Sequence, residues 1–200
     1  MRYLFVLLFI ISMSTSAQNF NADIISHREH YKKEFLEDKR SPLKGDQLKD
    51  LDFFAPDSNY RIDVRVEMLM GEQSFMIPTF SGTSKEYIRY AVLHCKIGDV
   101  PTNLTVYKNI ALSKQLEYRD YLFLPFTDFT NGKESYSGGR YLDLKTGDLE
   151  GGNAKIDFNK AYNPYCAYSD GYQCPKPPAE NQLQLCILAG ERNYKGKKTH

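Results

Sequence analysis

The chain has 200 residues, with 26 Lys and Arg against 25 Asp and Glu and a formal net charge of +1. This balance argues against a general nucleic-acid-binding protein, because such proteins need an excess of basic residues to neutralise phosphates. The length favours one domain, and a domain of this size can bury roughly 70% of the surface of its unfolded chain. We therefore expect a single β-rich domain over residues 18–200 with its own hydrophobic core.

The first 17 residues have the pattern of a secretory signal peptide. Arg2 supplies a positive charge, the stretch 3–11 is apolar throughout, and the small residues Thr15 and Ala17 precede a predicted cleavage before Gln18. The apolar run is shorter than the about 20 residues that span a bilayer, although an uncleaved anchor is the alternative. We expect an exported protein, periplasmic or extracellular, with no membrane span after removal of the signal.

Beyond the predicted cleavage site, the chain begins with helical periodicity. The segment 21–38 has an Asn at its start that can cap a helix and an apolar stripe opposite charged residues. A short helical turn over 46–51 follows. The apolar stripe consists of Ile24, Ile25, Tyr31, Phe35 and Leu36.

From Tyr60 onward the apolar residues alternate with polar ones, which indicates half-buried strands. Short strands at regular spacing, with turn residues between them, are typical of antiparallel barrels and sandwiches. The sequence predicts a mainly β fold, an antiparallel β-barrel or β-sandwich, with the N-terminal helix packed across an open end or face. The expected strands are 60–69, 74–80, 86–97, 104–107, 121–125, 140–144, 154–158 and 182–189.

Four segments carry motifs more specific than composition explains. They include Phe53-Phe54-Ala55-Pro56-Asp57, Pro125-Phe126-Thr127-Asp128, Asp157-Phe158-Asn159 and Cys174-Pro175-Lys176-Pro177-Pro178. Their combination resembles the bacterial family known as domain of unknown function 1684, over nearly the whole mature chain. Lys176 and Gln182 depart from the residues usual in the family. The resemblance implies kinship and brings no established activity with it.

The segment 124–144 contains a predicted loop with several polar side chains. Asp128, Glu134 and Tyr136 lie in it, and Arg140 opens the next strand. A guanidinium group holds a carboxylate through two parallel hydrogen bonds. Two interpretations of Arg140 follow: an ion pair that anchors the loop, with Asp128 or Asp157, or a binding group for an acidic ligand.

A second polar group follows the strand predicted to end near residue 158. Asp157, Asn159, Tyr162 and Asn163 are close together in sequence, and Asp157 and Asn159 lie on the same side of an extended chain. Converging polar side chains form binding sites, but they also satisfy the backbone of irregular loops. Both interpretations remain open at this level.

The cysteines indicate one disulfide. Cys166 and Cys174 bracket a seven-residue loop, and in an oxidising compartment this spacing favours a bond of about 2.6 kcal/mol on the chain-entropy estimate. A metal site or free thiols are the alternatives. Cys95 and Cys186 lie in predicted apolar strands, where cysteine behaves as a small buried apolar residue.

The four histidines do not form a recognised metal motif. His27 and His30 lie one helical turn apart, which favours a solvated helix face over a metal site. No phosphate-binding loop, dinucleotide fingerprint or nucleophile elbow appears. We therefore predict neither a metal nor a cofactor.

Two functional hypotheses of different classes follow. The first is a binding module for a small polar or amphipathic ligand, with Arg140, Asp157, Asn159 and Tyr162 at its mouth. The 15 Tyr and 12 Phe favour a pocket with aromatic walls. The second is a cell-envelope hydrolase that uses Asp157, or Asp128 with Glu134, as acid and base. A sealed pairing of Arg140 with an aspartate would instead indicate a structural or protein-interaction role.

Overall fold

The computed structural model describes the backbone of residues 2–199 and the side chains of residues 18–199. The predicted signal peptide over residues 1–17 lies outside the part described with its side chains. Among the residues that could be searched, no helix is long and apolar enough to cross a membrane.

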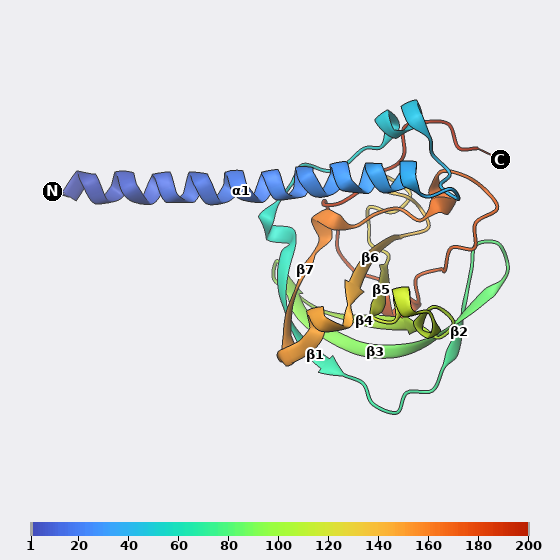
Figure 1. Cartoon of the computed structure of the whole chain (residues 1–200). Helices are drawn as coiled ribbons and strands as arrows, with labels where there is room; N and C mark the ends of the chain where they lie inside the picture. Colours follow the sequence, from blue (N-terminus) through green and yellow to red (C-terminus); the bar gives the residue numbers. More distant parts are fainter. Residues whose placement is uncertain (1, 200) are drawn as a thin grey trace.

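One long helix precedes a single antiparallel sheet, which confirms the mainly β prediction (Figure 1). The helix α1 spans Arg2–Glu37 and contains the predicted segment 21–38 except for its last residue. The sheet has the strand order β6-β5-β4-β3-β1-β7, with β2 paired to β3, and curls into a half-barrel. The strands are β1 (Arg61–Met68), β2 (Phe75–Pro78), β3 (Ser84–Ile97), β4 (Val100–Asn109), β5 (Tyr121–Phe126), β6 (Arg140–Lys145) and β7 (Asn153–Asp157).

Short 3-10 helices connect these elements. The first, η1, spans Gly45–Asp50 and confirms the helical turn predicted near residues 46–51. The others are η2 (Ser58–Tyr60), η3 (Leu112–Lys114), η4 (Leu116–Tyr118), η5 (Thr146–Gly152), η6 (Phe158–Lys160), η7 (Tyr165–Ala167) and η8 (Ala179–Asn181).

Strand alternation divides the two faces of the sheet. On β1 the side chains of Ile62, Val64 and Val66 are buried in the main core, and the residues between them are exposed or half-buried. This is the pattern of a strand with one face covered. The opposite face carries a second, aromatic cluster that includes Tyr87, Phe123 and Tyr141.

The predicted closing strand over 182–189 is wrong. The segment is buried at Leu183, Ile187 and Ala189, but none of the seven described strands includes it. Its polar backbone groups are satisfied mainly by loop backbone and side chains: Leu183 N donates to Thr127 O (2.7 Å), and Ile187 N donates to an Asp128 carboxylate oxygen (3.3 Å). Alternating burial therefore arises here without a neighbouring strand.

The guanidinium of Arg140 donates to backbone carbonyl oxygens that, in a sheet, would accept hydrogen bonds from a neighbouring strand. Its Nη1 donates to the carbonyl oxygens of Ala189 and Glu191, and its Nη2 donates to that of Ile187 (2.8 Å). Nη2 also pairs with Asp128 Oδ2 at 2.7 Å, and both side chains of this ion pair are fully buried. A single side chain at the start of β6 thus fixes the C-terminal segment to the sheet.

Asn181 performs a similar task between β4 and β5, which pair at a single position, Tyr107 with Phe123. Its amide nitrogen donates to Thr105 O (2.8 Å) and Pro125 O (2.7 Å), and its amide oxygen accepts from Thr105 N (2.7 Å). The two strands diverge here, and one buried side chain satisfies the backbone groups that are left unpaired.

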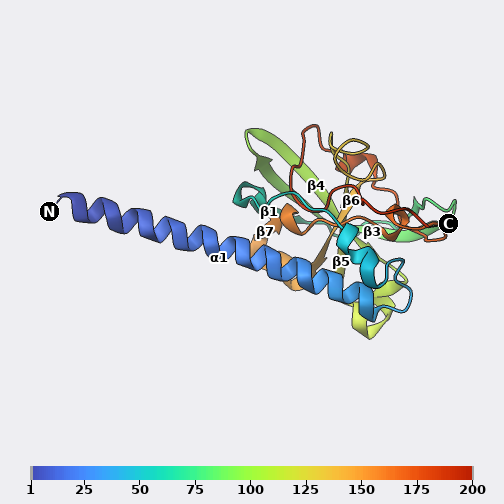
Figure 2. The same ribbon diagram turned by 90° about the horizontal axis from the view of Figure 1, so that it is seen from above.

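The helix α1 crosses the side of the half-barrel at which β6 and β7, the two ends of the sheet order, are found (Figures 1 and 2). In the part of α1 whose side chains are described, Ile24 and Phe35 are the buried apolar residues. Arg61 on β1 ties the helix to the sheet, because it pairs with Asp23 of α1 at 2.6 Å and with Asp157 of β7 at 2.7 Å.

We expect Arg140→Ala to lower the free energy of unfolding by about 3–5 kcal/mol, because it leaves the Asp128 carboxylate buried without its cation. Urea unfolding followed by circular dichroism measures this loss. Arg192→Ala is the matched control: Arg192 also pairs with an aspartate, Asp52 at 3.0 Å, but it is partly exposed. Its loss should stay below about 1 kcal/mol. Equal losses in the two variants would contradict an anchoring role for Arg140.

Candidate functional site

Four of the residues predicted to bind a ligand lie in the interior. Asp128, Arg140, Asn159 and Asn163 are each at most 6% exposed. The Arg140–Asp128 pair confirms the interpretation of Arg140 as a loop anchor. Asp128 is buried in this pair whereas Glu134 is exposed, so the two carboxylates do not face one common site, as an acid and base pair would need to.

The two buried asparagines hold backbone segments together. Asn159 accepts from Asp57 N (2.9 Å) and donates to Asp57 O (2.8 Å), so its amide pairs with that residue as a strand would. It also donates to Asp157 Oδ1 at 2.8 Å, so the predicted proximity of Asp157 and Asn159 is confirmed. Asn163 donates to Arg192 O at 2.8 Å. These contacts belong to the fold.

The remaining predicted residues separate into two pairs. Glu134 is exposed on its loop, and Tyr136 is half-buried against Phe80, with ring centroids 6.3 Å apart. Neither lines the cavity between α1 and the sheet, whereas Asp157 and Tyr162 do.

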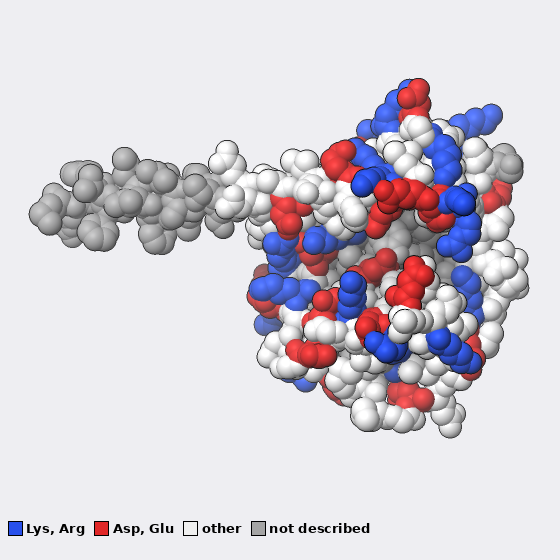
Figure 3. Space-filling view, viewed as in Figure 1, with Lys and Arg blue, Asp and Glu red and all other residues white. Residues whose placement is uncertain are grey.

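This cavity lies between α1 and the sheet and has a volume of about 930 Å³. Figure 3 shows it as a hollow below the helix, with acidic and basic side chains around it. Helix α1 contributes His27, His30, Tyr31 and Glu34 to its lining, and the strands β3, β5, β6 and β7 contribute the rest of the main wall.

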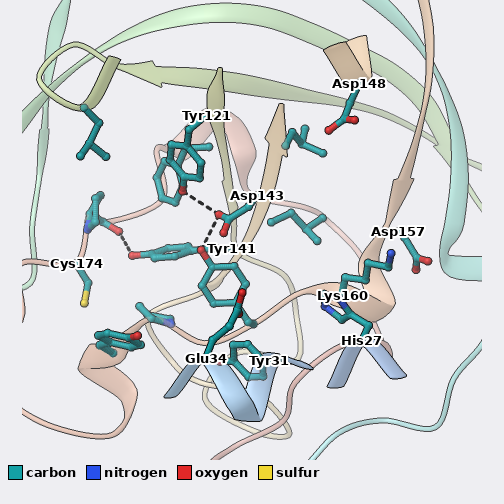
Figure 4. Close-up of a pocket in the computed structure, with 18 of the residues that line it drawn as sticks. His27, Tyr31, Glu34, Tyr121, Tyr141, Asp143, Asp148, Asp157, Lys160 and Cys174 are labelled. Atoms are coloured by element: carbon teal, nitrogen blue, oxygen red, sulfur yellow. Dashed lines mark hydrogen bonds between the residues drawn. The ribbon is translucent and has the colours of Figure 1, made fainter. Parts of the chain in front are cut away.

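Asp143 of β6 lies on the floor of the pocket (Figure 4). Tyr121 Oη donates to its Oδ1 at 2.8 Å, and Tyr162 Oη donates to the same oxygen at 2.7 Å. The surrounding protein raises the pKa of Asp143 above its ordinary value, while the two hydroxyl donors oppose this shift. Because the side chain remains accessible through the pocket, water there also moderates the effect of burial.

Aromatic rings form much of the wall around Asp143. The ring of Tyr141 contacts Phe123 edge-on at 4.7 Å and Tyr162 at 5.9 Å between centroids. Tyr141 Oη donates to Pro175 O, and Tyr31 Oη donates to Glu191 Oε2 at 3.1 Å. The hydroxyl hydrogens of these rings are therefore engaged within the protein.

Basic side chains gather where the pocket meets β7 and η6. His27 and Lys160 lie there beside Asp157 in Figure 4. Burial and the charge of Lys160 lower the pKa of His27, which favours its neutral form. Asp157 is already paired with Arg61. The pocket thus has an acidic floor at Asp143 and a basic region at this end.

The loop between Cys166 and Cys174 forms another part of the rim. The two cysteines lie at disulfide distance, as predicted, with Cα atoms 6.3 Å apart, and Cys174 lines the pocket. The prediction for Cys186 is wrong, because its side chain is exposed in the irregular C-terminal segment. Cys95 is half-buried on β3, and burial raises the pKa of its thiol.

No group of three or more His, Cys, Asp or Glu side chains suited to a metal ion occurs in the described part of the chain. His27 and His30 both line the pocket, and His30 lies 3.4 Å from Glu34 on the next helical turn. His30 is exposed, as the predicted solvated helix face requires, whereas His27 is half-buried.

Behind Tyr31 lies a buried carboxyl group, that of Glu191. It accepts hydrogen bonds from Tyr168 Oη (2.7 Å), Tyr31 Oη (3.1 Å) and Asn163 N (2.9 Å). Burial raises the pKa of Glu191 to about 7, and the three donors limit the rise. Since Tyr31 belongs to α1, this cluster connects the helix above the pocket to the C-terminal segment.

Sequence reasoning missed Asp143, Tyr121 and Tyr31 as site residues. One signal was available: in Tyr141-Leu142-Asp143-Leu144 the leucines alternate with a tyrosine and an acid, which places Asp143 beside an aromatic ring on the face away from the main core. No sequence signal indicates that α1 covers that face, because the contact joins segments more than a hundred residues apart.

Comparison with known proteins identifies relatives of this chain, but it assigns no activity to the chain. Residues 46–192 match the family described as "Protein of unknown function (DUF1684)". An uncharacterised protein from Haloarcula marismortui, solved by solution NMR, is 32% identical with a TM-score of 0.67, over 89% of this chain and 96% of that one. No curated protein matches the chain. The bacterial origin and the secretion that we expected from the sequence stay predictions.

We expect the buried Glu191 to make stability depend on pH. Its native pKa of about 7 lies above the ordinary 4.5, so the native state holds the proton more tightly than the unfolded state. This contribution is complete below about pH 4.5 and is lost as the pH rises through about 7, by at most about 3 kcal/mol.

Glu191→Gln removes this titration and, like the protonated carboxyl group, keeps one oxygen that only accepts hydrogen bonds. Urea unfolding of both proteins between pH 5 and 8 measures the difference between their free energies of unfolding. The other titrating groups contribute equally to both proteins and cancel from this difference. The variant should gain stability relative to the natural protein as the pH rises. A difference that is constant over this range would contradict a raised pKa.

Proposed function

The chain belongs to the DUF1684 family of proteins of unknown function, and we propose that it is a binding module for a small ligand in the pocket between α1 and β6. A volume of about 930 Å³ falls in the range of small-molecule sites. The lining combines aromatic rings with acidic, basic and histidine side chains, which suits a polar or amphipathic ligand.

The observation that carries the proposal is the position of Asp143. Asp143 is exposed to the pocket, and the two tyrosine hydroxyls that bond to Oδ1 hold its carboxylate in one orientation. A side chain that its neighbours fix in this way is suited to meet a ligand group. Asp157 and Tyr162, two of the residues singled out from the sequence, belong to the same pocket.

Binding is favoured over the alternative of a hydrolase. Asp128 is sealed against Arg140, and Asp157 is paired with Arg61. Among the described residues that line the pocket there is no serine or threonine, and the single cysteine, Cys174, is at disulfide distance from Cys166. The site therefore offers no hydroxyl of serine or threonine and no free thiol that a neighbouring base could activate.

We further propose that the protein is exported from a bacterial cell through a signal peptide over residues 1–17 and works in the periplasm or outside the cell. The charged start, the apolar run and the small residues before Gln18 support this. The pair Cys166–Cys174 supports it independently, because disulfides persist mainly in oxidising compartments.

Occupation of the pocket can be tested with three probes that share one ring: benzylammonium, benzyl alcohol and benzoate. We expect at least one to bind with a dissociation constant of about 1 mM, a usual value for so few atoms, and to shift the backbone amide resonances of β6. His27→Trp places a larger ring in the pocket wall and should weaken that probe by about tenfold or more.

Glu29→Trp is the control, because Glu29 is exposed on the same helix and does not line the pocket. It should leave the affinity within about twofold. If none of the three probes shifts pocket resonances, or if both tryptophan variants act alike, the proposed binding function is wrong.

Export predicts a mature protein that begins at Gln18. Expression of the full chain in a bacterial host, followed by osmotic fractionation and mass spectrometry of the intact protein, measures both the compartment and the mass. Ala17→Phe should block cleavage, because the last residue before the cut must be small. A cytoplasmic protein that retains residues 1–17 would contradict the prediction.

A further inference from the structure

We propose that the ligand of this pocket carries a protonated amine, which Asp143 binds. The inference rests on the proposed binding function and specifies the chemical class of the ligand. It predicts an ammonium group on the floor of the pocket, with the apolar body of the ligand against the aromatic rings.

The charge of Asp143 is not neutralised by the protein. Its described neighbours include two hydroxyl donors, but no Lys, Arg or His of the described chain forms an ion pair with it. The charged side chain that acts on Asp143 is another acid, Glu34 of α1, whose negative charge raises the pKa of Asp143 further. A cation beside Asp143 would relieve this repulsion.

The hydrogen bonds of Asp143 leave one oxygen for a ligand. Tyr121 and Tyr162 both donate to Oδ1, and Oδ2 receives no hydrogen bond from the described residues. An ammonium group brings three donors and no acceptor. It can therefore use Oδ2 together with the lone pairs of the tyrosine oxygens, whose hydrogens already point to Oδ1.

The aromatic wall favours the same ligand group. The hydroxyl hydrogens of Tyr141 and Tyr31 are bonded to Pro175 and Glu191, so these rings offer no donor to an anionic ligand. Aromatic faces attract cations, and the attraction grows where water is excluded. Near Asp143 the pocket wall thus offers the ligand hydrogen-bond acceptors and the faces of aromatic rings.

The basic residues of the pocket do not remove the preference for a cationic ligand group beside Asp143. Lys155 is paired with Asp63 across β7 and β1, and Figure 4 places Lys160 beside His27 and Asp157, apart from the Tyr121–Asp143 group. Lys85 also lines the pocket, but neither it nor the other two lysines is among the groups that shift the pKa of Asp143.

The experiment compares benzylammonium, benzyl alcohol and benzoate on the natural protein and on Asp143→Asn by NMR titration. The substitution keeps the shape of the side chain and an oxygen for the two tyrosine donors, and it removes only the charge. We expect benzylammonium to bind the natural protein at least about tenfold more tightly than benzyl alcohol, with benzoate weakest, as a charge-assisted hydrogen bond implies.

In Asp143→Asn the affinity for benzylammonium should fall about tenfold or more, to near that of benzyl alcohol, while benzyl alcohol changes by less than about threefold. Asp148→Asn is the matched control. Asp148 lines the same pocket, but its carboxylate accepts from the backbone N of Lys145 (2.7 Å) and from neither Tyr121 nor Tyr162, so its substitution should leave benzylammonium within about threefold.

The outcomes separate the two proposals. If benzyl alcohol or benzoate binds in the pocket as tightly as benzylammonium, or if Asp143→Asn keeps the full affinity for benzylammonium, the amine inference is overturned and the binding function stands. If no probe occupies the pocket, both are overturned. An unfolding midpoint in urea for Asp143→Asn that is at least that of the natural protein shows that lost affinity is not lost folding.

Discussion

The buried ion pair of Arg140 and Asp128 is the constraint on which the rest of the structure depends. A charge with no access to water is tolerated only when a partner and further hydrogen bonds compensate its desolvation. Arg140 finds these in Asp128 and in the carbonyl groups of residues 187, 189 and 191. The C-terminal segment is therefore held across the half-barrel by one side chain, and it covers the main core without forming a strand.

The position of that segment determines the pocket on the other side of β6. Glu191 is the last residue whose carbonyl Arg140 binds, and its carboxyl group accepts from Tyr31 on α1 and from Tyr168. Helix α1 is thus placed over the sheet by the same C-terminal segment that closes the core. The aromatic face of β5 and β6, which a helix would otherwise have to cover by apolar contact, is left as a cavity with Asp143 on its floor.

Local patterns predicted the elements better than their partners. Alternation of Ile62, Val64 and Val66 identified β1, and the apolar stripe identified α1, because both patterns are properties of one segment. The same alternation over residues 182–189 indicated a strand that does not form. Burial on one side is common to a strand and to an extended segment held by side chains, and the difference lies in distant donors such as Arg140.

The sequence by itself determined the antiparallel sheet, the leading helix, the family and the pairing of Cys166 with Cys174. Periodicity, motifs and the short spacing of the two cysteines are all properties of single short segments. Only the tertiary structure decided which polar residues are sealed in the fold and which face a pocket. Asn159 and Asp143 have similar polarity, yet one is buried against Asp57 and the other lies open to the cavity. The reason is physical: solvent access depends on what packs over a side chain, and here α1 arrives from the far end of the chain.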